Sequence, residues 1–186
     1  MGAYFFALLE CEVPKDVNDR RVRELECTCR GESQRLIAKC RQDGVCEVAR
    51  VKWISATDYS EEIARPTTID SSHCLLTCEG FHVRFGSGAI GLWHPLRWPR
   101  FVRDIEWQQA MLAACRGRAA MVDASDVIVT RDGSPIVTAF YRGATYHEAL
   151  TAGGEREAQV ASISELYEIV DEHGTWESHG YWRMTR

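Results

Sequence analysis

Residues 74–93 read CLLTCEGFHVRFGSGAIGLW, and this stretch decides the predicted fold. Three short apolar runs within it, at 74–78, 81–85 and 89–93, have the length and composition of β-strands, and glycines punctuate them. A block of strands without helices between them argues against alternating βαβ units. The stretch therefore favours an antiparallel sheet.

Further strands are predicted before this stretch. The apolar run over residues 1–9 has no basic residues ahead of it and is followed by acidic ones, so it indicates a buried first strand rather than a signal peptide. Residues 21–29 alternate between an apolar and a charged face, which predicts a strand with one wet face. Asp43-Gly44 predicts a hairpin turn between strands at 36–40 and 46–54.

The second half of the chain predicts helices mixed with one hairpin. The longest helix is predicted from about residue 103 to about residue 122, because apolar side chains recur there at helical spacing on one face. Asp132-Gly133 predicts a second hairpin that joins strands at 126–130 and 135–141. Two brief helices with capping boxes follow, one opened by Thr145 and Glu148 and the other by Ser162 and Glu165.

The predicted fold class is α+β, with an antiparallel sheet or sheets, hairpins, one long helix, and short helices packed on one face. A chain of 186 residues fits a single domain over residues 1–186. Two prolines, Pro95 and Pro99, suggest a two-part organisation within that domain. The first part, 1–94, is rich in strands, and the second, 100–186, mixes helices with a hairpin.

Composition indicates the compartment and the class of partner. No apolar run approaches the roughly 20 residues that a membrane span needs, so no membrane partner is expected. Eight cysteines without a signal peptide predict reduced thiols in the cytoplasm. The net charge of −5 lies in the second half, where residues 104–186 carry 7 basic and 13 acidic side chains. Such a surface repels phosphates, so a basic protein partner is favoured over nucleic acid.

Cysteine and histidine residues form two candidate zinc sets. The first is Cys27, Cys29, Cys40 and Cys46, and the second is His73, Cys74, Cys78 and His82. The ligand types suit zinc, but structural zinc sites normally use loop residues about two to four positions apart. None of the cysteines or the six histidines lies in a recognisable nucleophile motif. The sequence therefore predicts no metal, no cofactor and no catalytic residue.

The most informative feature is an acidic and aromatic segment close to the C-terminus. Residues 155–177 include seven acidic side chains and one basic side chain, whereas a solvated helix face usually mixes both signs. Acidic groups beside aromatic anchors are typical of a protein-binding surface. The predicted partner-binding residues are Glu165, Glu168, Asp171, Glu172, Trp176, Glu177, Tyr181 and Trp182. Two simpler interpretations stay open: a solvated helix face for the acids, and a hydrophobic plug that closes the core for the aromatics.

In this segment, Glu165 to Trp182, and in its general architecture, the chain resembles bacterial immunity proteins, which neutralise polymorphic or contact-delivered toxins. Those proteins are often small, acidic, tryptophan-rich α+β proteins of the cytoplasm. The resemblance implies a non-enzymatic module that occludes the active site of a cognate toxin, and a nuclease is the natural candidate because its cleft is basic. The alternative is a small enzyme with a Cys/His thiol or zinc site, and a third hypothesis is a subunit of a larger assembly.

Overall fold

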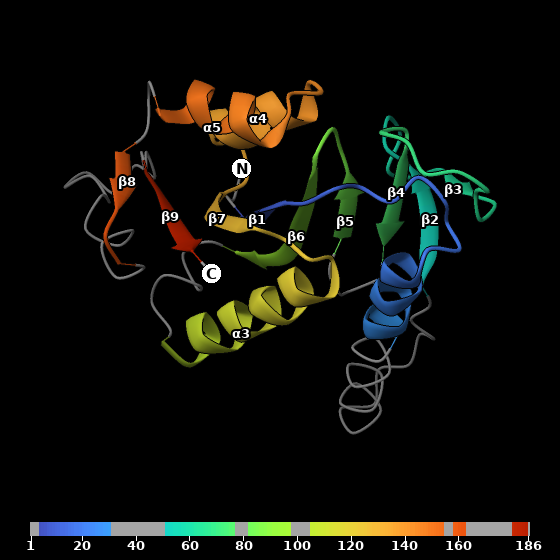
Figure 1. Cartoon of the computed structure of the whole chain (residues 1–186), viewed down its shortest axis with the longest axis horizontal. Helices are drawn as coiled ribbons and strands as arrows, with labels where there is room; N and C mark the ends of the chain where they lie inside the picture. The colour runs from blue at the N-terminus through green and yellow to red at the C-terminus, as the bar shows by residue number, and fades with distance from the viewer. Residues whose placement is uncertain are drawn as a thin grey trace.

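A computed structural model describes residues 4–30, 51–76, 82–97, 105–154, 158–162 and 180–185 of the chain. Within this part, nine strands form one sheet in the order β3-β2-β4-β5-β6-β1-β7-β9-β8 (Figure 1). The strands are β1 Tyr4–Glu10, β2 Lys52–Ser55, β3 Glu62–Ile63, β4 His73–Leu76, β5 His82–Phe85, β6 Ala89–Arg97, β7 Asp126–Arg131, β8 Ala158–Val160 and β9 Gly180–Thr185. Neighbouring strands pair antiparallel, except that β8 and β9 pair parallel. The predicted α+β class with a mostly antiparallel sheet is confirmed.

Strand β1 lies in the interior of the sheet, between β6 and β7. Phe5, Ala7 and Leu9 point to one face, Phe6 and Leu8 point to the other, and all five side chains are buried. Both faces of β1 are therefore covered, which explains why its sequence is a continuous apolar run rather than an alternating one. Because β7 belongs to the second half of the chain, this strand joins the two predicted parts within one sheet.

One face of the sheet is covered by helix α3, Ile105–Met121, and by a helix over residues 20–30 (Figure 1). Residues 21–29 were predicted to be a strand, and that prediction is wrong. Val22, Leu25 and Cys29 are the buried side chains, and their spacing is helical. Asp19 caps the helix, since its carboxylate accepts a hydrogen bond of 2.8 Å from the backbone N–H of Arg21. The alternation of charged residues in this segment hid the helical period.

The opposite face is covered by helices α4, Pro135–Tyr141, and α5, Tyr146–Gly154. The hairpin predicted over 126–141 is wrong, because its second arm is α4. The hydroxyl of Ser134 accepts a hydrogen bond of 3.2 Å from the backbone N–H of Val137, and Pro135 occupies the first turn. A serine cap followed by proline is a helix start, and it overrides the hairpin signal of Asp132-Gly133.

The capping box predicted for α5 is confirmed. The backbone N–H of Thr145 donates to the Glu148 carboxylate at 2.8 Å, and the backbone N–H of Glu148 donates to the Thr145 hydroxyl at 3.3 Å. The second predicted capping box, Ser162 with Glu165, lies partly outside the described residues, as does the hairpin around Asp43-Gly44.

The helices lie on both faces of the sheet rather than on one face as predicted. We call the two layers of buried side chains the α3 core, which contains Phe5, Leu9 and Cys115, and the α4–α5 core, which contains Phe6 and Leu8. Within the described part of the chain, no helix is long and apolar enough to cross a membrane.

Two adjacent glycines at the end of α5 give a matched test of the α4–α5 core. A Cβ atom on Gly153 would lie 1.9 Å from Cγ1 of Ile136 in α4, whereas a Cβ on Gly154 would meet nothing within 4 Å. We expect Gly153→Ala to lower the free energy of unfolding by about 1–3 kcal/mol through overpacking. Gly154→Ala should leave it unchanged or raise it by up to about 1 kcal/mol. Urea unfolding followed by circular dichroism measures both, and equal effects would contradict this packing.

Candidate functional site

A cluster of polar side chains lies at the end of the sheet where β1 ends and β7 begins. Glu10 of β1 and Asp126 of β7 are direct partners in the antiparallel ladder, so their side chains point to the same face. Arg183 of β9 is paired with Ile128, two residues along β7 from Asp126, and shares that face. The first residues of α5, Tyr146 and His147, lie over it. The sheet-end cluster comprises Glu10, Ser125, Asp126, Tyr146, His147 and Arg183.

The buried Asp126 forms an ion pair with Arg183, whose side chain is 36% exposed. Asp126 is 5% exposed, and both Nε and Nη2 of Arg183 lie 2.5 Å from its Oδ2. Its other oxygen, Oδ1, accepts a hydrogen bond of 2.9 Å from the backbone N–H of Val127. The hydrogen bond to Asp126 raises the pKa of Arg183. Both charges are therefore satisfied within the protein, as buried charges require.

Glu10 lies between a serine and a histidine. The hydroxyl of Ser125 donates to Oε2 of Glu10 at 2.6 Å, and Nε2 of His147 lies 2.7 Å from Oε1. In a nucleophilic triad the imidazole stands between the hydroxyl and the carboxylate, because it has to accept the hydroxyl proton. Here the carboxylate takes the middle place, and the His147 side chain is 75% exposed. The arrangement links three elements and does not activate Ser125 through His147.

Tyr146 adds a buried hydroxyl to the cluster. Its ring packs in the α4–α5 core, and its hydroxyl has no hydrogen-bond partner of normal geometry among the described residues. Burial and the neighbouring Asp126 carboxylate both raise the pKa of Tyr146. The phenol therefore stays protonated at neutral pH and is no general base.

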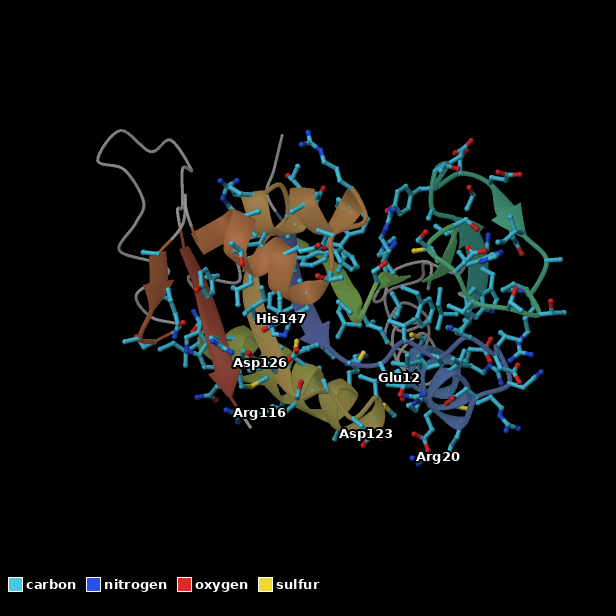
Figure 2. The ribbon with its side chains drawn as sticks, turned by 45° about the horizontal axis from the view of Figure 1, so that its top comes forward. Glu12, Arg20, Arg116, Asp123, Asp126 and His147 are labelled. Carbon is cyan, nitrogen blue, oxygen red and sulfur yellow. The ribbon has the colours of Figure 1, made fainter. Side chains whose placement is uncertain are left out.

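A cavity of about 390 Å³ opens beside the cluster, on the side of α3. Its polar lining is Arg116, Ser125 and Asp126, and its apolar lining is Ala119, Ala124, Val127 and Met184. Figure 2 shows Arg116, Asp126 and His147 close to one another in this view. Since Asp126 is already paired with Arg183, Arg116 is the charged group that this cavity offers to a ligand or a partner side chain.

Asp123 occupies an unusual backbone position next to this cavity. Its φ of 53° makes it the one non-glycine residue with positive φ in the described part of the chain. The backbone N–H of Ala124 donates to the carbonyl of Ala119 at 2.8 Å, and that of Asp123 donates to the carbonyl of Ala120 at 3.4 Å. This is a Schellman ending for α3, and glycine is the usual residue where Asp123 stands. An acid at a helix C-terminus is also unfavourable for the helix dipole.

Two of the predicted partner-binding residues lie in described parts of the chain. Tyr181 is 8% exposed and packs in the α4–α5 core, while Trp182 is partly buried against the α3 core. For these two side chains the structure favours the alternative interpretation, in which they close the core. The remaining six, Glu165, Glu168, Asp171, Glu172, Trp176 and Glu177, lie outside the described residues.

The cysteines of the two zinc sets are not brought together where the structure describes them. Cys27 is exposed and Cys29 is buried on the helix over 20–30, while Cys40, Cys46 and Cys78 lie outside the described residues. Cys74 donates its thiol to the carbonyl of Val83 at 3.1 Å. Among the described residues, no three His, Cys, Asp or Glu side chains are grouped to hold a metal ion.

Sequence reasoning did not find the sheet-end cluster. Glu10 follows an apolar strand and Asp126 precedes one, so each resembles an ordinary residue at a strand end. Only the pairing of β1 with β7 places these two carboxylates side by side. The near-complete burial of Asp126 beside Arg183 is not indicated by its place at the start of a predicted strand.

Replacing Asp123 with glycine tests the strain at the end of α3. We expect Asp123→Gly to raise the free energy of unfolding by about 0.5–1.5 kcal/mol, because glycine adopts positive φ without a penalty and the substitution removes a charge that opposes the helix dipole. Asp123→Asn is the matched control, since asparagine removes the charge and keeps the side-chain shape. Urea unfolding separates the two contributions, and a glycine variant less stable than the native protein would disprove the assignment.

Thiol labelling tests whether any described cysteine is reactive. Burial raises the pKa of Cys11 and of Cys74 to about 12, so their thiolate fraction is negligible at pH 8. We expect iodoacetamide to modify Cys27 rapidly and Cys11, Cys29, Cys74 and Cys115 only after unfolding, as read by mass spectrometry of each peptide. Labelling in urea, where all five should react alike, is the control. Rapid modification of Cys11 or Cys74 in the folded protein would contradict the structure.

Comparisons with known proteins leave the site without a precedent. No protein-family model, no curated protein and no solved structure matches this chain. The function is therefore inferred from the residues and geometry described above.

Proposed function

We propose that this protein is a non-enzymatic protein-binding module, and that it acts as an immunity protein that occludes the active site of a cognate toxin. The proposed partner is a basic protein, such as a nuclease domain. The observation that carries the proposal is the state of the ionisable groups at the sheet end. Asp126 pairs with Arg183 and Glu10 contacts His147, while Glu12 and Asp123, which are close to Glu10 and Asp126 in the chain, are exposed.

The pairing at the sheet end argues against catalysis by this cluster. A general base needs a free lone pair within reach of substrate, and a nucleophile needs a base beside it. Asp126 is buried and bound to Arg183, and Glu10 accepts from Ser125 while it contacts His147. Groups held in this way stabilise the junction of β1, β7 and α5.

The exposed acids supply the surface for a basic partner. Glu12 follows β1 and Asp123 ends α3, and both are exposed without an ion-pair partner among the described residues (Figure 2). The sequence also contains an acidic segment over residues 155–177, which carries seven acidic residues and one basic residue. One-signed charge accelerates encounter with an oppositely charged partner. An inhibitor that competes with a nucleic acid for a basic cleft gains from such a surface.

The enzyme alternative rests on the cysteines. Cys11, Cys29, Cys74 and Cys115 are buried, and buried thiols are poor nucleophiles and behave as small apolar side chains. Free thiols fit a reducing compartment, so we place the protein in the cytoplasm as part of this proposal. Rapid labelling of a buried cysteine would favour the alternative that the protein is an enzyme.

Charge reversal with a matched control tests the proposal. The tagged protein is used to capture partners from the lysate of its own host, and each captured protein is then expressed alone and together with the native chain. We expect a basic protein that stops cell growth when expressed alone and does not when the native chain is present.

The variant Glu12→Lys with Asp123→Lys should slow association with that protein about tenfold or more at low salt. The control variant, Glu61→Lys with Glu62→Lys, makes the same charge change at the far edge of the sheet on and beside β3, and it should change the rate much less. If both variants slow association equally, Glu12 and Asp123 have no specific role in binding the partner. A captured protein whose toxicity the chain does not reduce would refute the immunity function.

A further inference from the structure

A second cavity, of about 170 Å³, lies between the β5–β6 turn and the end of α4. Its described lining includes two arginines, Arg84 of β5 and Arg142 at the C-cap of α4, together with Ser71. No carboxylate is among the described residues that line it. Two cations that share a small cavity without an acid repel each other, so the site favours an anion between them.

Arg84 is held in place before any ligand arrives. Its Nη1 donates to the backbone carbonyl of Ala56 at 3.2 Å and to the Tyr59 hydroxyl at 2.7 Å. Its guanidinium carbon lies 4.8 Å from the centroid of the Tyr141 ring, within cation–π range. All described partners of Arg84 use Nη1 or the face of the guanidinium. Its Nε and Nη2 donors, the pair that matches two oxygens of a phosphate or carboxylate, have no partner among the described residues.

Arg142 supplies the second positive charge. Its side chain is exposed and forms no hydrogen bond or ion pair with the described residues. The negative end of the helix dipole accounts for one cation at the end of α4. It does not account for Arg84, which comes from a strand on a different part of the chain and has no acidic partner among the described residues.

In the described part of the chain, no ion pair joins the acids Asp70 and Asp132 to Arg84 or Arg142. Asp70, next to Ser71, is bound by Ser72 and lies 2.9 Å from Nδ1 of His73. Asp132 is half-buried, and burial raises its pKa. Neither acid lines the cavity. The positive charge of Arg84 is therefore not cancelled locally.

Two glycines are among the residues that line the cavity. A Cβ atom on Gly86 would lie 2.4 Å from the Phe140 ring, and Gly143 has a φ of +94°. Both positions therefore disfavour a side chain, and Gly143 requires a conformation that other residues rarely adopt. Two glycines and the short side chain of Ser71 therefore line the cavity without filling it.

We propose that this cavity binds a tetrahedral oxyanion, namely a phosphate group, between Arg84 and Arg142. Arg84 donates from Nε and Nη2 to two phosphate oxygens, and Arg142 closes the site from the exposed side. The aromatic residues Phe140 and Tyr141 also line the cavity, which favours a phosphate carried on an aromatic or other planar group over the free ion. This site is separate from the sheet-end cluster and does not depend on the proposed function.

Nuclear magnetic resonance of the arginine Nε–H groups of the full chain tests the site at low ionic strength. We expect inorganic phosphate to shift the Arg84 and Arg142 signals saturably, with the signal of Arg23, exposed on the helix over 20–30, as the internal reference. Phenyl phosphate that binds more tightly than inorganic phosphate would support a phosphoryl group on a larger molecule. Equal or tighter binding of inorganic phosphate would indicate that the ligand of the site is the free anion. Linear shifts shared with Arg23 would overturn the proposal.

Substitution gives the second measurement. Arg142→Gln removes an exposed charge without a described partner, so the chain should fold normally and bind phosphate roughly tenfold to 100-fold more weakly. Arg23→Gln is the matched control and should bind as the native chain does. Arg84→Lys keeps the charge but loses the paired donors, and it should also weaken binding. Native phosphate affinity in Arg142→Gln and Arg84→Lys would disprove the assigned geometry.

Discussion

The rest of this structure depends on the burial of both faces of β1. Phe5, Ala7 and Leu9 need one apolar layer, and Phe6 and Leu8 need a second. The five side chains therefore require helices on both sides of the sheet, α3 and residues 20–30 on one side and α4 with α5 on the other. Burying the four larger apolar side chains, Phe5, Phe6, Leu8 and Leu9, contributes on the order of 10 kcal/mol before the entropy of ordering them is subtracted.

The same constraint creates the sheet-end cluster. Where β1 leaves the covered region, its last residue is Glu10, and its ladder partner on β7 is Asp126. Two carboxylates side by side repel each other unless a cation or hydrogen-bond donors stabilise them. Arg183 from β9 and His147 from α5 provide these contacts, and both elements also cover the α4–α5 core. The cluster is therefore a polar boundary of the core.

Short sequence patterns correctly predicted those strands and helices that are determined by their own residues. The runs at β1, β4, β5 and β6 are confirmed strands, α3 falls within the range predicted for a helix, and the Thr145–Glu148 capping box begins α5. Two elements were mistaken because two local signals competed. In residues 21–29 the alternation of charged residues predicted a strand and masked the helical spacing of Val22, Leu25 and Cys29. At 135–141 the Asp-Gly turn signal was given more weight than the helix start at Ser134-Pro135. The candidate site could not be predicted, since Glu10 meets Asp126 only through a register between distant strands, and Arg84 meets Arg142 only through packing.

The position of β1 between β6 and β7 has a consequence during protein synthesis. Once β6 has been made, β1 can pair along one edge, but its other edge waits for β7, which begins more than a hundred residues after β1 ends. At ordinary rates of translation this wait lasts roughly ten seconds. Throughout that time a strongly apolar strand presents an unpaired edge, which is the feature that promotes association between nascent chains. A chaperone that shields the first ten residues of this chain would therefore act at its most vulnerable point.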